Sequence, residues 1–311
     1  MKNITYINKK YINHDNAKVS VEDRGFLFGD SIYELISVAD KEIIDIDQHL
    51  SRLKISLKKI KLKYNFKKQN FLKIIKRLIK TNNIVNGYIY IQITRGVAER
   101  KHEFPKNYKP TTIIFTKHLN IDKKIYKKGV KIITLPDLRW LRRDIKTTAL
   151  LSNILSKQIA VEKKAHESWL IDNGYITEGS ASNAWIIKNS KTIITHPANN
   201  KILKGVTRDT IIKLLKKNNF NVKEKPFNII EAKNAKEAFL TSSTLSVLPV
   251  VKIDNYNISN GKPGDVTKKI INLYNDYIFK NKSSLGDHWS KKFPNLKDRP
   301  LIKLMKELKI A

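Results

Sequence analysis

One lysine in the segment RWLRRDIKTTALLSN, residues 139–153, is placed where a lysine could act as a chemical reagent. Lys146 lies between an arginine-rich stretch and small hydroxylated residues, just before an apolar run that predicts a helix from about 149 to 165. An amine can form a covalent bond to a carbonyl group or accept a proton. A lysine alone is far more often solvated surface, and this chain has 61 Lys and Arg residues. Other segments must therefore support a chemical role for Lys146.

Two segments have the composition of an anion-binding site. In GVTRDT, residues 205–210, a glycine, a hydroxyl and an arginine stand where a loop enters a predicted helix. Amides at a helix N-terminus favour phosphate, although an ordinary threonine-capped helix explains this segment more simply when it is taken alone. TSST, residues 241–244, follows a predicted strand, and its hydroxyls form either a turn or a second part of an anion cradle.

Two further groups could bind other parts of a ligand. Glu178, in the segment ITEGSASNA, lies among small residues that would let a ligand approach, and a carboxylate there can keep the nitrogen of a heterocycle protonated. Arg100 and His102 are two residues apart in a charged loop, so an extended backbone would direct both side chains to one side as a trap for a carboxylate. Solvated surface is the simpler interpretation of each group alone.

The four features together form one chemical inventory. They supply a lysine amine, a phosphate cradle, a carboxylate for a ring nitrogen and a cationic pair for a substrate carboxylate. Pyridoxal 5'-phosphate chemistry needs this set, because the cofactor acts as the electron sink while the protein anchors and orients it.

The elements that must position these residues begin with an α+β region. A long polar loop at 97–108, which contains Arg100 and His102, separates two predicted strands, and loops of that length in a compact domain are usually functional or disordered. The elements predicted here are strands at 5–14, a hairpin at 29–47 turning near Asp40, a helix with Asp47 as N-cap through about Lys63, a helix at 67–81 with Phe71, Ile74, Ile75, Leu78 and Ile79 on one face, and strands at 87–96 and 109–119.

A charged stretch without clear periodicity predicts a domain boundary after the second of these strands. The expected division is an N-terminal α/β domain at 1–118, a linker at 119–124, a C-terminal domain at 125–280 and a tail at 281–311 of unknown role. The C-terminal domain is predicted to contain a strand at 129–137, the helix after Lys146, hairpins turning at Asn173-Gly174 and Asn189-Ser190, a helix at 207–219, a strand at 237–243 and a closing helix at 265–279, and the tail a short amphipathic helix at 299–311.

Composition limits the classes of protein and partner. The formal net charge of +33 first suggests nucleic acid, but the lysines are spread along amphipathic segments without a motif or a stacking platform, so we expect no nucleic-acid partner. The heavy use of Lys, Ile and Asn resembles the composition bias of an AT-rich genome, and the sequence alone does not decide between such a bias and a functional charge. The chain has no cysteine, which excludes disulfides and thiolate sites, and we expect no metal. No apolar run is long enough for a membrane span and the N-terminus lacks the apolar core of a signal peptide, so we expect a cytoplasmic protein without a membrane partner.

The motifs as a group resemble the D-amino-acid aminotransferases of the fold-type IV pyridoxal phosphate enzymes. The likeness is nearly collinear from about residue 3 to 280 and includes SVEDRGFLFGDSIYE, HLSRL, TRGVAERKHEFP, RWLRRDIKT, TEGSASN, HPANNKILKGVTRD and TSST. The resemblance implies a two-domain α+β fold, with a smaller N-terminal α/β domain, a larger C-terminal pseudo-barrel domain and the cofactor between them. It also implies transamination from D-alanine to 2-oxoglutarate, with pyruvate and D-glutamate as products, by ping-pong kinetics in a homodimer.

The resemblance assigns a role to each candidate residue. Lys146 corresponds to the lysine that joins the cofactor covalently and then moves the Cα proton. Glu178 corresponds to the partner of the ring nitrogen. The implied phosphate ligands are Arg52, Val206, Thr207, Ser242 and Ser243, and the implied substrate-carboxylate trap is Tyr33, Arg100 and His102, with the arginine and histidine donated across the dimer interface.

Three positions depart from the family pattern. Ala181 stands where a serine is expected, and Leu245-Ser246 replaces an expected Ser-Glu pair, which puts substrate preference in doubt but not the cofactor. The alternatives within the fold are an aminodeoxychorismate lyase, a branched-chain aminotransferase or an amine transaminase of R specificity. The alternative from another class is a basic nucleic-acid-binding protein, which predicts steeply salt-dependent binding to duplex DNA.

Overall fold

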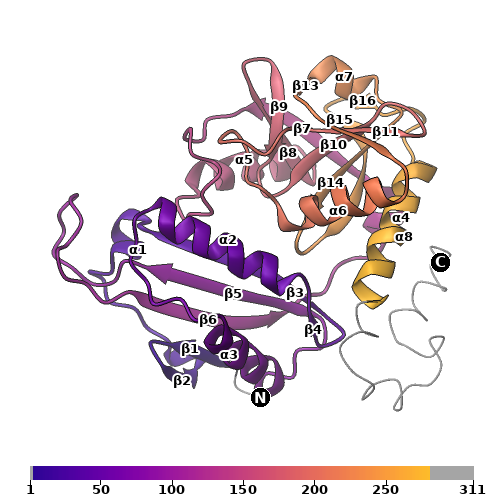
Figure 1. Cartoon of the computed structure of the whole chain (residues 1–311). Helices are drawn as coiled ribbons and strands as arrows, with labels where there is room; N and C mark the ends of the chain where they lie inside the picture. Colours follow the sequence, from indigo (N-terminus) through magenta and orange to yellow (C-terminus); the bar gives the residue numbers. More distant parts are fainter. Residues whose placement is uncertain (1–2, 281–311) are drawn as a thin grey trace, which may run out of the picture. The chain divides into compact units, whose positions relative to one another are not determined.

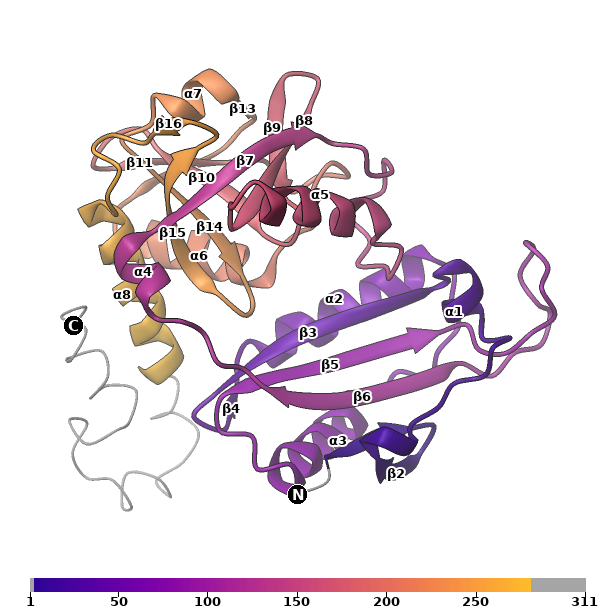
Figure 2. The same cartoon turned by 180° about the vertical axis from the view of Figure 1, so that it is seen from behind.

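A computed structural model of the chain describes residues 3–280, which form two compact units (Figures 1 and 2). Unit 1 contains the residues up to Ile121 together with Arg139–Ile154 and Asn199–Val206. Unit 2 contains Asp122–Leu138, Leu155–Ala198 and the described residues from Thr207 onward. Both units combine helices with strands, in agreement with the α+β fold class.

The division differs from the one expected from a single linker. The first crossing, after Ile121, falls inside the segment 119–124, but Arg139–Ile154 and Asn199–Val206 belong to unit 1 rather than to a C-terminal domain. Lys146 is therefore a residue of unit 1. Local periodicity can indicate a linker, but contacts between distant segments decide which unit a segment joins. The sequence pattern therefore did not show that these two later segments belong to unit 1.

Unit 1 is built on a six-stranded sheet with the order β2-β1-β6-β5-β3-β4. The hairpin predicted at 29–47 is present: β3 pairs with β4 through Asp40 and Lys41, which have positive φ angles of 49° and 67°. Residues 5–14 were expected to pair with the segment that follows, but β1 pairs with β2 and with β6. The strands are β1 (Ile4–Ile7), β2 (Lys10–Asn13), β3 (Ser31–Ala39), β4 (Glu42–Ile43), β5 (Gly87–Thr94) and β6 (Thr111–His118), and the helices before β5 are η1 (His14–Asn16), α1 (Arg24–Phe28), α2 (Ile46–Lys59) and α3 (Lys68–Thr81).

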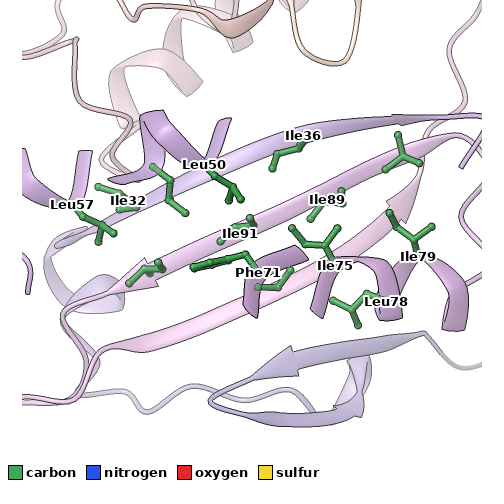
Figure 3. Packing of buried hydrophobic residues seen from close by; sticks show 14 of the residues in the cluster. Ile32, Ile36, Leu50, Leu57, Phe71, Ile75, Leu78, Ile79, Ile89 and Ile91 are labelled. Carbon is green, nitrogen blue, oxygen red and sulfur yellow. The ribbon is translucent and has the colours of Figure 1, made fainter. Parts of the chain in front are cut away.

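Helices α2 and α3 cover the apolar face of this sheet. Alternate residues of β3 and β5 are buried, and they pack with one face of each helix in a single core (Figure 3). The helix expected at 67–81 is confirmed, and its predicted apolar face is buried except at Ile74, which is partly buried. This core contains Ile32, Ile36, Leu50, Leu53, Leu57, Phe71, Ile75, Leu78, Ile89 and Ile91 among others.

The predicted start of α2 was wrong. Asp47 lies inside the first turn and forms an ion pair with Lys68 (2.7 Å), while the cap position is Asp45, which has φ 52° and no side-chain capping bond. An acidic residue is favourable anywhere in the first turn of a helix, so its presence does not locate the cap. The helix also ends at Lys59, four residues earlier than expected, and Lys61 has a positive φ of 53°.

Unit 2 contains a ten-stranded sheet with the order β12-β11-β10-β14-β15-β7-β8-β9-β13, and β16 pairs with β15. Strand β10 is buried throughout because Ala184 and Ile186 face one apolar cluster while Trp185 and Ile187 face another, against α6 and α8. The strands are β7 (Val130–Pro136), β8 (Glu167–Asp172), β9 (Tyr175–Gly179), β10 (Asn183–Ile187), β11 (Thr192–Thr195), β12 (Asn221–Glu224), β13 (Phe227–Asn228), β14 (Glu237–Ser242), β15 (Ser246–Ile253) and β16 (Tyr256–Asn257), and the helices are α4 (Lys124–Lys128), α5 (Leu151–Glu162, which begins in unit 1), α6 (Val206–Lys217), α7 (Ile229–Lys233) and α8 (Asp265–Lys280).

The elements predicted for this half of the chain are present. The Asn173-Gly174 turn joins β8 to β9 with φ angles of 49° and 80°, and the Asn189 side chain accepts bonds from the Lys191 and Thr192 amides between β10 and β11. The helix predicted for the tail lies outside the described residues. Among the described helices, none is both long and apolar enough to span a bilayer.

Candidate active site

The backbone of Lys146 is fixed against the open edge of strand β3. Strand β4 has only two residues, and they pair with the C-terminal end of β3, which leaves its N-terminal edge for another segment. Residues 146–148 take this edge: the Tyr33 amide donates to the Lys146 carbonyl (3.0 Å) and the Thr148 amide donates to the Ser31 carbonyl (3.3 Å). Because β4 is much shorter than β3, the segment that contains Lys146 can pair with the free part of the β3 edge.

The Lys146 amine lies against an aromatic ring. The side chain is partly buried, and Nζ lies 4.1 Å from the centre of the Tyr33 ring. Among the described residues 3–280, Lys146 Nζ has no carboxylate within ion-pair distance and no hydrogen-bond partner, whereas Lys59 pairs with Asp144 at 2.5 Å. An amine that is partly buried and not held by a carboxylate suits covalent or proton-transfer chemistry.

A buried carboxylate holds Arg52 on the core face of the same sheet. Glu34 accepts hydrogen bonds from Arg52 Nε and Nη2 (both 2.7 Å) and from His49 Nδ1 (2.7 Å). Burial raises the pKa of Glu34, but the charge and hydrogen bonds of Arg52, together with His49, outweigh it and lower the pKa to about 2. Burial also lowers the pKa of His49, against the opposing effect of Glu34, so a neutral imidazole donates to the carboxylate.

Arg52 also contacts the segment that leads into α6. Its Nη1 donates to the carbonyl of Lys204 (2.9 Å), two residues before Val206, the first residue of the helix. The bonds to Glu34 and Lys204 come from all three nitrogens of the guanidinium, Nε, Nη1 and Nη2. Val206 and Thr207 are buried, and the first amides of any α-helix have no acceptor within the helix. A guanidinium and the first amides of a helix are each donors of the kind that binds phosphate.

Arg100 and His102 lie together, as their spacing predicted. Both contact Phe28, the last residue of α1: the Arg100 guanidinium carbon is 5.3 Å from the centre of the ring, and the His102 ring meets it edge-on at 5.6 Å. Their side chains are exposed. Two exposed cationic or hydrogen-bonding groups on one side of a loop can bind a carboxylate.

In unit 2, Glu178 is a buried carboxylate at the end of β9. It is 4% exposed and accepts a hydrogen bond from Asn183 Nδ2 (2.9 Å). The turn between Glu178 and Asn183 is bound by a second buried carboxylate, that of Glu167. Glu167 accepts bonds from the Ser180 hydroxyl, the Ala181 amide (3.2 Å) and the Ser182 hydroxyl (3.0 Å).

The hydrogen bonds of Glu167 explain how the turn forms with alanine at position 181. Residue 181 contributes its backbone amide to Glu167, and the hydroxyls come from its two neighbours, so the turn keeps its bonds without a serine at 181. Space is tight here as well, because a Cβ atom on Gly179 would lie 2.3 Å from Ser182 Oγ. The turn that follows Glu178 is thus held by the Glu167 carboxylate and closely packed at Gly179.

The TSST segment forms a turn in unit 2. Ser242 ends β14, and its hydroxyl accepts a bond from the amide of Leu245 (3.2 Å), while Ser246 begins β15 with φ 55°. Ser242 and Ser243 are partly exposed. The Leu245 carbonyl accepts a bond from the Tyr126 hydroxyl (2.9 Å), and the leucine side chain packs against an apolar cluster of unit 2.

The predicted site residues fall into two sets. Lys146 contacts Tyr33, Arg100 and His102 share one partner, and Arg52 reaches the segment before Val206, all within unit 1. Glu178, Thr207, Ser242 and Ser243 belong to unit 2.

Sequence reasoning missed the two supporting carboxylates, Glu34 and Glu167, and the imidazole of His49. For Glu34 a signal was present, because the alternation Ile32, Glu34, Ile36 places a carboxylate on the apolar face of a strand, where it needs a partner.

Comparisons with known proteins agree on one family. The model of the family described as amino-transferase class IV matches residues 31–253. The D-alanine aminotransferase of Staphylococcus haemolyticus is 40% identical over 274 residues, which are 88% of this chain and 97% of that protein. The D-alanine aminotransferase of Bacillus licheniformis is 37% identical over 263 residues, which are 85% of this chain and 93% of that protein.

Solved structures resemble the fold at lower sequence identity. The branched-chain amino acid aminotransferase of Escherichia coli has a TM-score of 0.83 at 24% identity, covering 93% of this chain and 98% of that one. The branched-chain aminotransferase of the archaeon Thermoproteus uzoniensis, solved with norvaline, has a TM-score of 0.81 at 20% identity, covering 91% and 97%. At these identities the likeness concerns the fold alone.

Proposed function

Because the chain belongs to the class IV aminotransferase family and is a pyridoxal 5'-phosphate-dependent aminotransferase, we propose that it moves the amino group of D-alanine to 2-oxoglutarate. The products are pyruvate and D-glutamate. The observation that carries the site assignment is the Lys146 amine, partly buried against Tyr33 and without a carboxylate or hydrogen-bond partner among residues 3–280. The preference for D-alanine rests on the curated relatives that bear that name.

The donor set of the chain fits the cofactor. Arg52, the first amides of α6 at Val206 and Thr207, and the Ser242 and Ser243 hydroxyls would hold its phosphate group. Glu178, buried and hydrogen-bonded to Asn183, would face the ring nitrogen and keep it protonated. When bound, pyridoxal 5'-phosphate accepts the amino group and delocalises the electron pair left at the substrate Cα.

The remaining steps belong to residues of the chain. Lys146 takes the proton from Cα and returns it at the other end of the transfer, which requires its amine to be neutral at that moment. Tyr33, Arg100 and His102 hold the substrate carboxylate, and a bidentate guanidinium contact fixes which face of Cα presents its hydrogen to Lys146. Selectivity for the D-enantiomer follows from that orientation.

The homodimer is part of the proposal, with Arg100 and His102 acting in the site of the other subunit. A row of exposed apolar residues on α5 supports an association surface: Leu151 is 69% exposed, Ile154 60% and Leu155 56%. Monomeric proteins rarely expose a contiguous apolar surface on one helix without a binding partner. The cytoplasmic location stays a prediction.

Spectroscopy with both enantiomers of alanine tests the function. Purified protein supplied with pyridoxal 5'-phosphate should acquire a visible absorbance band, and D-alanine should convert it to near-ultraviolet absorbance while L-alanine leaves it unchanged. Pyruvate should then appear in steady state only when 2-oxoglutarate is supplied. A band that L-alanine bleaches and D-alanine does not would contradict the proposed stereochemistry, and absence of any band would contradict the cofactor site.

The alternatives of the same fold give different outcomes. A lyase would release pyruvate from aminodeoxychorismate without a 2-oxo acid. An amine transaminase of R specificity would turn over (R)-amines that lack a carboxylate faster than D-alanine, and a branched-chain enzyme would prefer L-leucine. A basic nucleic-acid-binding protein would bind duplex DNA with a steep dependence on salt.

A further inference from the structure

The loop that contains Arg100 and His102 is held at its base by buried side chains. This loop, residues 96–110 between β5 and β6, is called the arm here (Figure 2). Most of its residues from 99 to 109 are exposed, and the hydrogen bonds that pair β5 with β6 do not continue through it, since β5 ends at Thr94 and β6 begins at Thr111. A loop of this kind needs other bonds to hold a defined conformation.

Arg24, the first residue of α1, supplies such bonds. Its side chain is 3% exposed, and Nη1 donates to the carbonyl of Lys101 (2.6 Å) while Nη2 donates to the carbonyl of His102 (3.4 Å). The third nitrogen, Nε, donates to Asp30 (2.8 Å). One guanidinium thus joins the body of unit 1 to the peptide units after Lys101 and after His102.

The backbone of the same region reinforces this attachment. The Arg24 amide donates to the carbonyl of Gly96 (2.9 Å), and Asp23 forms an isolated β-bridge with Val97. Asp23 in turn accepts bonds from the Gly25 amide (2.8 Å) and the Thr94 hydroxyl (3.0 Å). The start of α1 and the start of the arm therefore form one hydrogen-bonded structure.

Phe28 connects this attachment to the side chains of the arm. The Arg24 guanidinium carbon lies 4.8 Å from the centre of the Phe28 ring, and that of Arg100 lies 5.3 Å from it. The His102 ring meets Phe28 edge-on. Arg24 therefore fixes the arm through two peptide carbonyls and also contacts the ring on which both trap residues lie.

Because a second arginine, Arg95, also binds Asp30, the effect of losing the bonds from Arg24 to the arm can be separated from the effect of leaving Asp30 unpaired. Arg95 donates to both oxygens of Asp30 (Nε–Oδ2 2.7 Å, Nη2–Oδ1 3.0 Å) and lies over Phe104 (3.7 Å to the ring centre). Asp30 keeps these two bonds if Arg24 is replaced, so the carboxylate is not left unpaired. The bonds that only Arg24 makes are those to the carbonyls at positions 101 and 102.

We propose that Arg24 is a positioning residue for the substrate carboxylate: it holds the arm so that Arg100 and His102 are already oriented before substrate binds. The inference rests on the proposed function, because the carboxylate is that of the amino acid and of the 2-oxo acid. Orientation before binding lowers the entropic cost of binding, which appears in the Michaelis constant rather than in the turnover number.

The test uses the full-length holoenzyme and the variants Arg24→Lys and Arg24→Gln. Lysine keeps the positive charge but lacks the three separate nitrogens from which Arg24 bonds Asp30 and the two carbonyls, so it should not reproduce all three bonds. The matched control is Arg77→Gln, because Arg77 also lies over an aromatic ring, that of Tyr11 (3.9 Å), but on α3 and away from the arm. Thermal unfolding establishes that each variant is folded.

Two measurements decide the outcome. Hydrogen exchange of the arm amides, measured without substrate, should be about ten-fold faster in both Arg24 variants and unchanged in Arg77→Gln. The Michaelis constants for D-alanine and 2-oxoglutarate, and the inhibition constant of the unreactive carboxylate propionate, should rise about ten-fold while the turnover number changes less than about three-fold.

The failure of this inference differs from a failure of the proposed function. If the unsubstituted enzyme does not use D-alanine, the proposed function fails, and arm exchange together with propionate binding still tests Arg24. If D-alanine is a substrate but Arg24→Lys leaves arm exchange or the Michaelis constants unchanged, the positioning role is overturned. A loss of turnover number with constant Michaelis constants would equally overturn it.

Discussion

The Nζ atom of Lys146 lies 4.1 Å from the centre of the Tyr33 ring, and the next residue on that strand, Glu34, binds Arg52 on the opposite face of the sheet. Successive side chains of a strand point to opposite faces, so β3 presents a residue of the proposed carboxylate trap on one side and the support of the proposed phosphate ligand on the other. Two roles of the site are therefore set by adjacent residues of one strand.

Replacement of Lys146 by alanine should abolish transamination without unfolding the protein. The loss should exceed about a thousand-fold in turnover number, because both the covalent attachment and the proton transfer depend on this amine. The fold should survive, since the Lys146 carbonyl still accepts from the Tyr33 amide. A coupled pyruvate assay and thermal unfolding measure the two effects. Lys54→Ala, an exposed lysine on α2, is the control and should be fully active.

Replacement of Glu178 by glutamine should lower the turnover number by about a hundred-fold while the protein still binds pyridoxal 5'-phosphate. An amide cannot stabilise a protonated ring nitrogen as a carboxylate does, but it preserves the size of the side chain and can accept from Asn183. Steady-state rates and the absorbance spectrum of the bound cofactor check this. Glu162→Gln, at the exposed end of α5, should match the unsubstituted enzyme, and equal rates in both variants would remove Glu178 from the mechanism.

The ion pair of Glu34 predicts a loss of stability in acid. The pKa is lowered from 4.5 to about 2 in the folded protein, so the stabilisation is fully present above about pH 4.5 and is lost as the pH falls toward 2. The contribution is on the order of 3 kcal/mol.

Glu34→Gln should therefore have a lower free energy of unfolding at pH 7 and a shallower decline between pH 5 and 2. Urea unfolding at a series of pH values measures both. Glu99→Gln, from an exposed pair with Lys101, should keep the slope of the unsubstituted protein. A parallel decline in Glu34→Gln would contradict the assignment.

The apolar residues exposed on α5 predict a dimer that one charge can dissociate. Ile154→Asp should shift the protein to a monomer in sedimentation at micromolar concentration and should greatly reduce activity, if Arg100 and His102 act in the other subunit. Ile230→Asp, on α7, introduces the same charge at a residue that is 67% exposed and should leave the mass unchanged. An unsubstituted protein that sediments as a monomer would refute the predicted assembly.

Much of the secondary structure follows from short-range patterns. The apolar face of α3, the alternation in β3 and β5, and the turns at Asp40 and Asn173 were all predicted and are present. The cap of α2 was misplaced at Asp47, because acidic residues favour the whole first turn of a helix. The helix predicted at 299–311 lies outside the described residues and stays a prediction.

The sequence by itself indicated the candidate residues: Lys146, Glu178 and the Arg100–His102 pair by residue type and spacing, and Arg52 by the motif that resembles the family's. Only the tertiary structure decided that Lys146 joins unit 1 and that its amine lies over Tyr33. It also showed that three buried side chains support other candidate residues: Glu34 binds Arg52, Glu167 binds the turn after Glu178, and Arg24 binds the arm. The physical reason is the distance along the chain over which each feature is decided. Periodicity and motifs depend on neighbours a few residues away, whereas the partner of a buried charge is chosen by packing between segments distant in the chain, as with Arg24 and Lys101.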